Sequence, residues 1–395
     1  MTRLWRRLAG RGWFIPAFFL LIAAPALFQI LLPDPQRDER RVLATMPALP
    51  ATPDQARHLP DAIDGWLKDR FGLRQPLVRI NNWLRWQAFG EIATPRIIIG
   101  RHGRLFLAGH DDGPATLITG LCGADADDAA IDRGAGIIVR GLERVRAAGL
   151  DAALLLVPTA PRLYPEDIPE PFATACAGRR PPVDRVAALV AASDVGPDLI
   201  YPIDLMLGLK AGSEPIPRHH FHWAGEAPVR VAEDVAERHW QLPRTLTLPL
   251  RTKGRNSDLN GLNPGMGASD AIREPDARAV GIRTCEGAAC GPIDGLTPGA
   301  EFVLERYTRP EPGPRLLIIA DSFGDEISRN FLEQFGEVWR VVTNNLPALS
   351  PTDRRVLADE LKARFQGERV LYIYHDAAAL GGLTVIADLF WPPPA

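Results

Sequence analysis

Apolar residues fall into distinct patterns along this chain. Residues 13–32 (WFIPAFFLLIAAPALFQILL) form an apolar run without a charge, about the length that a helix needs to cross a bilayer. Apolar residues at helical intervals predict further helices over residues 60–89, 131–148 and 182–193, near Gly225, after Ser322 and from Pro351. The pattern therefore predicts a membrane span followed by a structured domain.

Short apolar runs bounded by turn residues predict strands between these helices. Two such runs surround His102 and Gly103 in RIIIGRHGRLFLAG, which predicts a hairpin. Further strands are expected in DAALLLV, LIYPIDL, LLIIA, VWRVV and RVLYIY. Strands that alternate with helices imply an α/β fold with a mostly parallel sheet flanked by helices.

These patterns divide the chain into four segments. Residues 1–12 are a basic tail, 13–32 a transmembrane anchor, 33–90 a linker with a helical lead-in, and 91–390 the α/β domain. Within that domain, residues 244–310 are rich in turn residues, which predicts a loop-rich insertion or a set of short strands.

The charges that flank the apolar run predict its orientation. The residues before it are basic without acidic neighbours, at Arg3, Arg6, Arg7 and Arg11. The positive-inside rule then places the N-terminus in the cytoplasm and the rest of the chain outside it. Small residues at Ala23, Ala24 and Ala26 leave a cleaved signal peptide as the alternative, but the run exceeds the usual signal core, which favours an uncleaved anchor.

Composition narrows the class of protein. The chain has 395 residues, 46% of them hydrophobic, and a net charge of −3, so nothing suggests a nucleic-acid binder. Four cysteines lie in the part expected to be exported, and their spacing matches no zinc motif. We expect disulfides instead, between Cys285 and Cys290 across a short loop and between Cys122 and Cys176.

A serine lies at the end of one predicted strand, in LLIIADSFGDEISRNF. Ser322 follows the strand directly and precedes a helix, so it is expected at the carboxyl edge of the sheet, where ligands bind in α/β folds. The helix N-terminus also offers free N–H groups to an oxyanion. The alternative is that Asp321 or Ser322 only caps the helix. A nearby base would favour a nucleophile.

Histidines in the segment RHHFHW supply a candidate base. His219, His220 and His222 lie between a predicted strand and a predicted helix, again at the carboxyl edge. His220 and His222 would share one side of an extended segment and could bind a metal, but no third ligand is suitably spaced. We therefore expect neither a metal nor a cofactor.

Six segments together resemble a known family, the SGNH-hydrolase-like polysaccharide O-acetyltransferases typified by AlgJ and AlgX of alginate acetylation. In chain order they are ERRVLATMPALP, DGWLKDRFGLRQPLVRINN, IIIGRHGRLFL, LLLVPTAPRLYPEDIP, HFHWAGEA and IIADSFGDE. They cover most of residues 39–376, with the order and spacing of the family. The resemblance implies an SGNH-hydrolase-like sheet.

The resemblance also implies roles for single residues. Ser322 would be the nucleophile and His222 its base, but residue 220, which holds an aspartate in the family, is a histidine here. A slow Ser–His dyad is therefore expected, with Asp376 as an alternative acid. Further candidates are Asp321 beside the nucleophile, Arg162 and Trp223 for substrate binding, and Asn344 and Asn345 as oxyanion donors.

The function expected from this resemblance is acetyl transfer outside the cytoplasm. The protein would be a single-pass inner-membrane O-acetyltransferase, or an esterase, with its catalytic domain in the periplasm. The acceptor would be a polysaccharide, and a polytopic membrane O-acyltransferase would deliver the acetyl group. The alternative is a non-catalytic relative that binds polysaccharide or acts as a scaffold in an export complex, for which the histidine at position 220 is the best support.

Overall fold

Two compact units make up the chain in a computed structural model, which describes residues 14–31, 44–69, 73–109, 116–124, 126–377 and 389–390. The first unit comprises Met1–Thr94 with Asn260–Gly267. The second comprises Pro95–Leu259 with Ala268–Ala395. All of the candidate site residues lie in the second unit.

The first unit is helical among its described residues. Its helices are α2 (Phe14–Leu31), α3 (Pro53–Asp69) and α4 (Arg74–Leu84), with a π-helical turn η1 (Arg85–Phe89). The helix predicted over residues 60–89 is thus divided between these last elements, and Gly90 ends it with a left-handed φ of 64°. Trp13 and Leu32, at the ends of the predicted span, lie outside the described residues. No helix in the described part of the chain meets the combined length and apolarity of a membrane span.

A seven-stranded sheet forms the centre of the second unit. Its order is β4-β3-β11-β9-β10-β8-β7, and the first five strands run parallel to one another. The strands are β3 (Asp151–Val157), β4 (Leu199–Ile200), β7 (Arg283–Glu286), β8 (Leu304–Thr308), β9 (Arg315–Ala320), β10 (Glu337–Val342) and β11 (Arg369–His375). β3, β9 and β11 are almost continuously apolar because both of their faces are buried. The predicted mostly parallel α/β architecture is confirmed.

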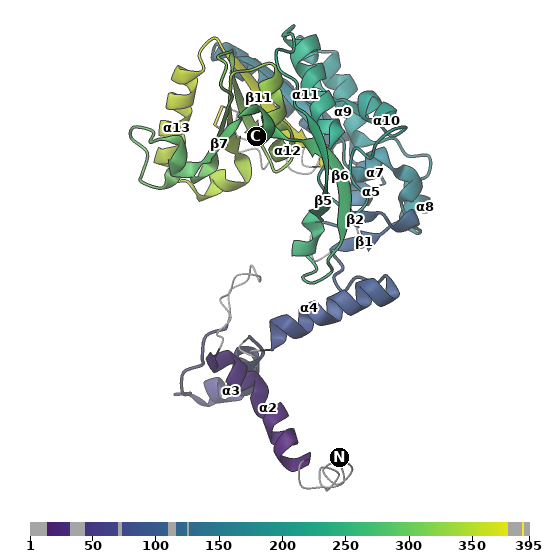
Figure 1. Ribbon diagram of the computed structural model, residues 1–395, viewed down its shortest axis with the longest axis vertical. Helices are drawn as coiled ribbons and strands as arrows, with labels where there is room; N and C mark the ends of the chain where they lie inside the picture. The colour runs from purple at the N-terminus through teal and green to yellow at the C-terminus, as the bar shows by residue number, and fades with distance from the viewer. Residues whose placement is uncertain are drawn as a thin grey trace. The chain divides into compact units, whose positions relative to one another are not determined.

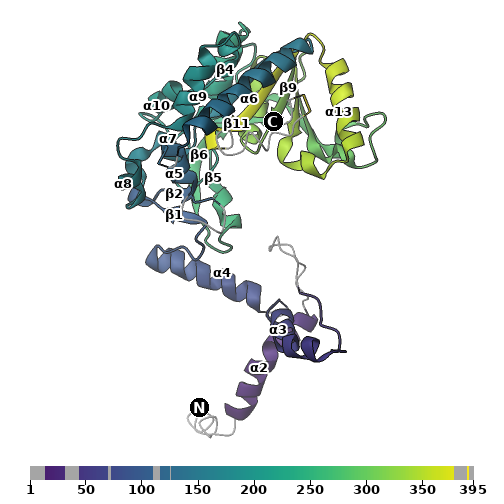
Figure 2. The same cartoon turned by 180° about the vertical axis from the view of Figure 1, so that it is seen from behind.

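Helices cover both faces of this sheet (Figures 1 and 2). Apolar side chains of α6, α9 and α13 pack on one face, and those of α11 and α12 belong to the core on the other. The bounds are α6 (Asp128–Ala147), α9 (Pro182–Ala191), α11 (Glu226–Asp234), α12 (Gly324–Ser328) and α13 (Pro351–Arg364). Shorter helices are α5 (Thr116–Cys122), α7 (Ala160–Leu163), α8 (Phe172–Cys176) and α10 (Ile203–Leu209).

Several local predictions are confirmed. β1 (Ile97–Ile99) and β2 (Leu105–Leu107) form the predicted antiparallel hairpin, with His102 at a left-handed φ of 59° in its turn. Both predicted disulfides, Cys122–Cys176 and Cys285–Cys290, are present. The expected strand LIYPIDL is shorter than predicted: it ends at Ile200, and α10 begins after Pro202.

The segment 244–310 contains four strands with two different roles. β5 (Leu250–Asn256) and β6 (Ser269–Pro275) pair with each other in a two-stranded antiparallel sheet. β7 and β8 instead join the central sheet as its antiparallel edge. The β5–β6 hairpin lies over the α11–α12 side of the second unit in Figure 1. It carries a residue that the sequence did not point to.

Candidate active site

A tight turn connects β9 to α12 and presents Ser322 at the carboxyl edge of the sheet. Asp321 organises this turn: its carboxylate accepts the amide of Phe323 at 2.8 Å and that of His375, on neighbouring β11, at 3.0 Å. Asp321 therefore braces the turn, and no hydrogen bond links its side chain to Ser322 or His222 among the described residues. α12 can begin this close to β9 because residue 324 is glycine; a Cβ there would lie 2.3 Å from the Cβ of Ala320.

His222 lies against this serine. Its Nε2 is 2.8 Å from the Oγ of Ser322, which is hydrogen-bonding distance for a nucleophile and its base. The next residue holds the two segments together, because the indole N–H of Trp223 donates to the carbonyl of Phe323 at 2.9 Å. Trp223 is fully buried. In this structure its ring fixes the histidine loop to the nucleophile turn, and substrate binding by Trp223 stays a prediction.

Asp258 completes the arrangement from a distant segment. It follows β5 in the short helix η6 (Asp258–Gly261), and its Oδ2 is 2.5 Å from Nδ1 of His222. The backbone amides of Phe221 and His222 also donate to this carboxylate, at 3.0 and 2.9 Å. Burial alone would raise the pKa of Asp258, but these hydrogen bonds outweigh it and lower the pKa below its usual value. Asp258 is therefore ionised and can stabilise a protonated His222.

This acid corrects the expectation of a Ser–His dyad. His220 is buried and makes no hydrogen bond to His222; its ring nitrogens lie 3.8 Å from Asp258 and 3.7 Å from Asp270. Burial lowers the pKa of His220, so its imidazole is neutral at pH 7. It occupies the place of the family aspartate without taking its contact, because the hairpin brings Asp258 to Nδ1 of His222 instead.

Asp376, the other candidate acid, points elsewhere. It is fully buried, and its carboxylate accepts hydrogen bonds from the backbone N–H and the hydroxyl of Thr159. Burial raises its pKa to about 6. Arg162 lies in the same region, where it pairs with Asp184 at 2.9 Å and donates to the hydroxyl of Tyr201 at 3.3 Å. Neither Asp376 nor Arg162 makes a hydrogen bond to Ser322, His222 or Asp258.

The oxyanion candidates lie on the adjacent strand. Asn344 and Asn345 are in η11 (Thr343–Ala348), which follows β10, and β10 pairs with β9 up to Ala320. Among the described residues, neither side chain is bonded to Ser322 or His222. The backbone N–H of Ser322 is a further donor: it has no hydrogen-bond partner in the described part of the chain, whereas that of Phe323 is taken by Asp321.

Aromatic rings surround the base. Phe221 packs edge-to-face on His222 and Phe323 at centroid distances of 5.0 and 5.3 Å, and Phe323 lies 5.1 Å from His375. Burial lowers the pKa of His375, which removes a competing positive charge from beside His222. No group of His, Cys, Asp and Glu that could hold a metal occurs among the residues described.

The comparisons with known proteins give distant likenesses. No protein-family model and no curated protein matches the sequence. A DHHW family protein from Eubacterium siraeum DSM 15702 is 15% identical, with 75% of this chain and 99% of that chain covered and a TM-score of 0.46. The structure of Bacillus cereus PatB1 with a sulfonyl adduct is 10% identical over 66% of this chain and 93% of that chain, with a TM-score of 0.44.

The O-acetyltransferase domain of Pseudomonas putida AlgJ is also similar. It is 16% identical over 73% of this chain and 93% of that chain, with a TM-score of 0.40. Each of these three proteins is at most 16% identical to this chain, with a TM-score below 0.5.

Proposed function

We propose that this protein is an O-acetyltransferase that carries acetyl on Ser322. The observation that supports this proposal is the ordered series Ser322–His222–Asp258, with distances of 2.8 and 2.5 Å. Such a series makes a serine nucleophilic, because the histidine takes its proton and the ionised acid stabilises the imidazolium. A non-catalytic relative would have no need to keep all three groups in contact.

The reaction would proceed in two steps. Ser322 Oγ attacks the acetyl carbonyl while His222 Nε2 takes its proton, and the backbone N–H of Ser322 donates to the oxyanion. The leaving group departs with that proton. A hydroxyl of the acceptor then gives its proton to His222 and attacks the acetyl-serine. The bond between the acetyl group and Ser322 Oγ breaks, and His222 returns the proton to Oγ, which restores the enzyme. Water in place of the acceptor would give esterase activity.

The acceptor that we propose is a polysaccharide, on the basis of the motif resemblance. A polytopic membrane O-acyltransferase would supply the acetyl group, as the same resemblance implies. The polysaccharide and the acetyl group would both reach the enzyme outside the cytoplasm. The proposal therefore requires the catalytic domain to lie there.

The experiment that tests the proposal uses the purified full chain and 4-nitrophenyl acetate. We expect an acetyl group on the Ser322 peptide by mass spectrometry. Ser322→Ala should abolish it and lower turnover by at least about 10³-fold, since the variant lacks the hydroxyl that attacks the acetyl carbonyl. Ser213→Ala is the control. Among the described residues, the Ser213 hydroxyl donates to the backbone carbonyl of Leu209 and bonds none of the three residues of the series. Equal turnover by the parent and by Ser322→Ala, together with no acetyl group on the Ser322 peptide of the parent, would favour the non-catalytic alternative.

We further propose that α2 anchors the protein in the inner membrane, with the catalytic domain in the periplasm. α2 is 18 residues long without a charged side chain, and Phe19, Leu20 and Leu21 are more than half exposed. A reporter fused after Ala395 should be active only outside the cytoplasm, and the protein should stay with membranes in high salt. Cytoplasmic activity would contradict this orientation, whereas a soluble form that starts near residue 27 would show cleavage.

A further inference from the structure

The triad acid is carried by a hairpin that lies outside the central sheet. Asp258 lies two residues after the end of β5, and β5 and β6 form a two-stranded sheet of their own. Ser322, in contrast, follows a strand buried in the middle of the seven-stranded sheet. The distance between Asp258 and the other two triad members therefore depends on the contacts that hold the hairpin in place.

One set of contacts joins the hairpin to the histidine loop. On β6, Asp270 accepts the backbone N–H of His219 at 2.9 Å and lies 2.9 Å from its Nδ1. After β5, the hydroxyl of Ser257 donates to the carbonyl of His219, and Asp258 accepts the amides already described. These bonds fix the hairpin to the loop that carries the base, but they do not reach the nucleophile.

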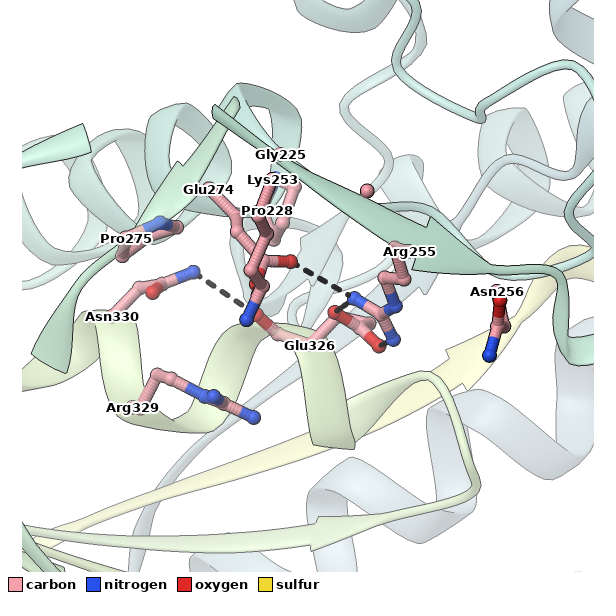
Figure 3. A pocket seen from close by; sticks show the side chains of 11 residues that line it. Gly225, Pro228, Lys253, Arg255, Asn256, Glu274, Pro275, Glu326, Arg329 and Asn330 are labelled. Carbon is pink, nitrogen blue, oxygen red and sulfur yellow. Dashed lines mark hydrogen bonds and ion pairs between the residues drawn. The ribbon is translucent and has the colours of Figure 1, made fainter. Parts of the chain in front are cut away.

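A second contact joins the hairpin to the helix that follows the nucleophile (Figure 3). Arg255, three residues before Asp258, presents both Nη atoms to the two carboxylate oxygens of Glu326 in α12; the Nη1–Oε2 distance is 2.7 Å. Glu326 is one helical turn beyond Ser322, and its side chain is only 10% exposed. The hydrogen bond to Glu326 raises the pKa of Arg255 despite its burial. A two-point, partly buried pair of this kind fixes orientation as well as distance.

We propose that Arg255 is a positioning residue of the triad: its pair with Glu326 holds the hairpin against α12 and so keeps Asp258 at Nδ1 of His222. The pair lines a pocket of about 430 Å³ and touches none of the reacting groups. This inference rests on the proposed function only in that turnover serves as one of its measurements. A loosened hairpin would leave Ser322 and His222 in contact while the acid moves away.

The test uses the full chain and 4-nitrophenyl acetate. Arg255→Ala should lower kcat by about 10- to 100-fold, because a displacement of about 1 Å in a catalytic group costs on that order. KM should change less than threefold, since no group that binds the ester is removed. Arg255→Lys should lie between the parent and Arg255→Ala, because lysine keeps the charge and loses the two-point geometry. The reversed pair Arg255→Glu with Glu326→Arg should be at least tenfold faster than Arg255→Glu alone.

The matched control is Lys253→Ala, on the same strand. Lys253 pairs with Glu274 on β6, its side chain is 59% exposed, and it makes no ion pair with α12 among the described residues. Its kcat should stay within twofold of the parent.

A second measurement does not depend on turnover. The proton between Nδ1 of His222 and Asp258 should give a far-downfield NMR signal in the parent, because the hydrogen bond is short. In Arg255→Ala we expect this signal to move upfield or disappear. Parental kcat together with an unchanged signal would overturn the inference, as would a reversed pair no faster than Arg255→Glu. Failure of the acetyl-enzyme proposal would instead appear as turnover that survives Ser322→Ala.

Discussion

At the scale of single residues, His220 stands at the position where the family that the motifs resemble has an aspartate, but Asp258 makes the contact with the base. The distance from Asp258 to His222 is 2.5 Å. Burial lowers the pKa of His220 and leaves it neutral between Asp258 and Asp270. A neutral ring can pack behind two carboxylates, whereas a third carboxylate there would repel both of them.

Asp258→Asn should lower kcat for an acetyl ester by about 10⁴-fold, because the amide cannot hold the histidine tautomer or stabilise the imidazolium. His220→Asp alone should also lower kcat, since it adds a buried negative charge within about 4 Å of Asp258. In the double variant, the new aspartate can take over the contact with His222. We therefore expect it to be at least tenfold faster than Asp258→Asn in steady-state assays.

Asp270→Asn is the comparison for these variants. It removes a carboxylate equally close to His220 that makes no contact with His222, so its loss should be far smaller than that of Asp258→Asn. A small effect of Asp258→Asn together with a large gain in His220→Asp would restore the dyad interpretation.

At the scale of elements, the hairpin β5–β6 determines whether the site is complete. Its first strand, LRTKGRN, has polar residues at nearly every position, and most of them are exposed. Such a strand has no apolar alternation by which the sequence could reveal it. It forms because β6 pairs with it over its whole length and because ion pairs such as Arg255–Glu326 fix it to the domain.

The strand β9 and its turn are the opposite case. Its apolar run is buried on both faces, and Asp-Ser-Phe-Gly follows where the strand must end. Glycine at position 324 permits α12 to start within van der Waals contact of Ala320. Both features are local, so the sequence was sufficient to predict a serine at the carboxyl edge of the sheet.

At the scale of the whole molecule, Asp376 links stability to pH. It is fully buried with a pKa of about 6, which is above the value for an exposed aspartate. The folded state therefore retains this proton at a pH where the unfolded chain has lost it. The contribution of Asp376 to stability falls as pH rises from about 4 to 6, by an amount on the order of 3 kcal/mol.

Asp376→Asn should remove this dependence. Urea unfolding between pH 4 and pH 7 should show the variant gaining stability relative to the parent as pH rises. Acetyl ester turnover should change little, because Asp376 bonds Thr159 and not His222. A collapse of turnover in Asp376→Asn would mean that this carboxylate reaches the triad after all. Parallel stability curves for the two proteins would contradict the raised pKa.

The sequence by itself determined the features that depend on neighbouring residues. The buried strands, most helices, the β1–β2 hairpin, the two disulfides and the corner at Ser322 all follow from local patterns or from a small number of cysteines. The contact between His222 and Ser322, which lie 100 residues apart, was expected from the motifs of the family that the chain resembles.

Only the tertiary structure decided which acid completes the triad. Asp258 lies in a polar segment without a motif, and 36 residues separate it from His222. Its position comes from the backbone pairing of two exposed strands and from the ion pair between Arg255 and Glu326 of α12, and both join residues that lie far apart in the sequence. The contacts of Trp223 and Asp376 were likewise visible only in the tertiary structure, because each is buried against a partner that lies far away in the sequence and that no local pattern indicates.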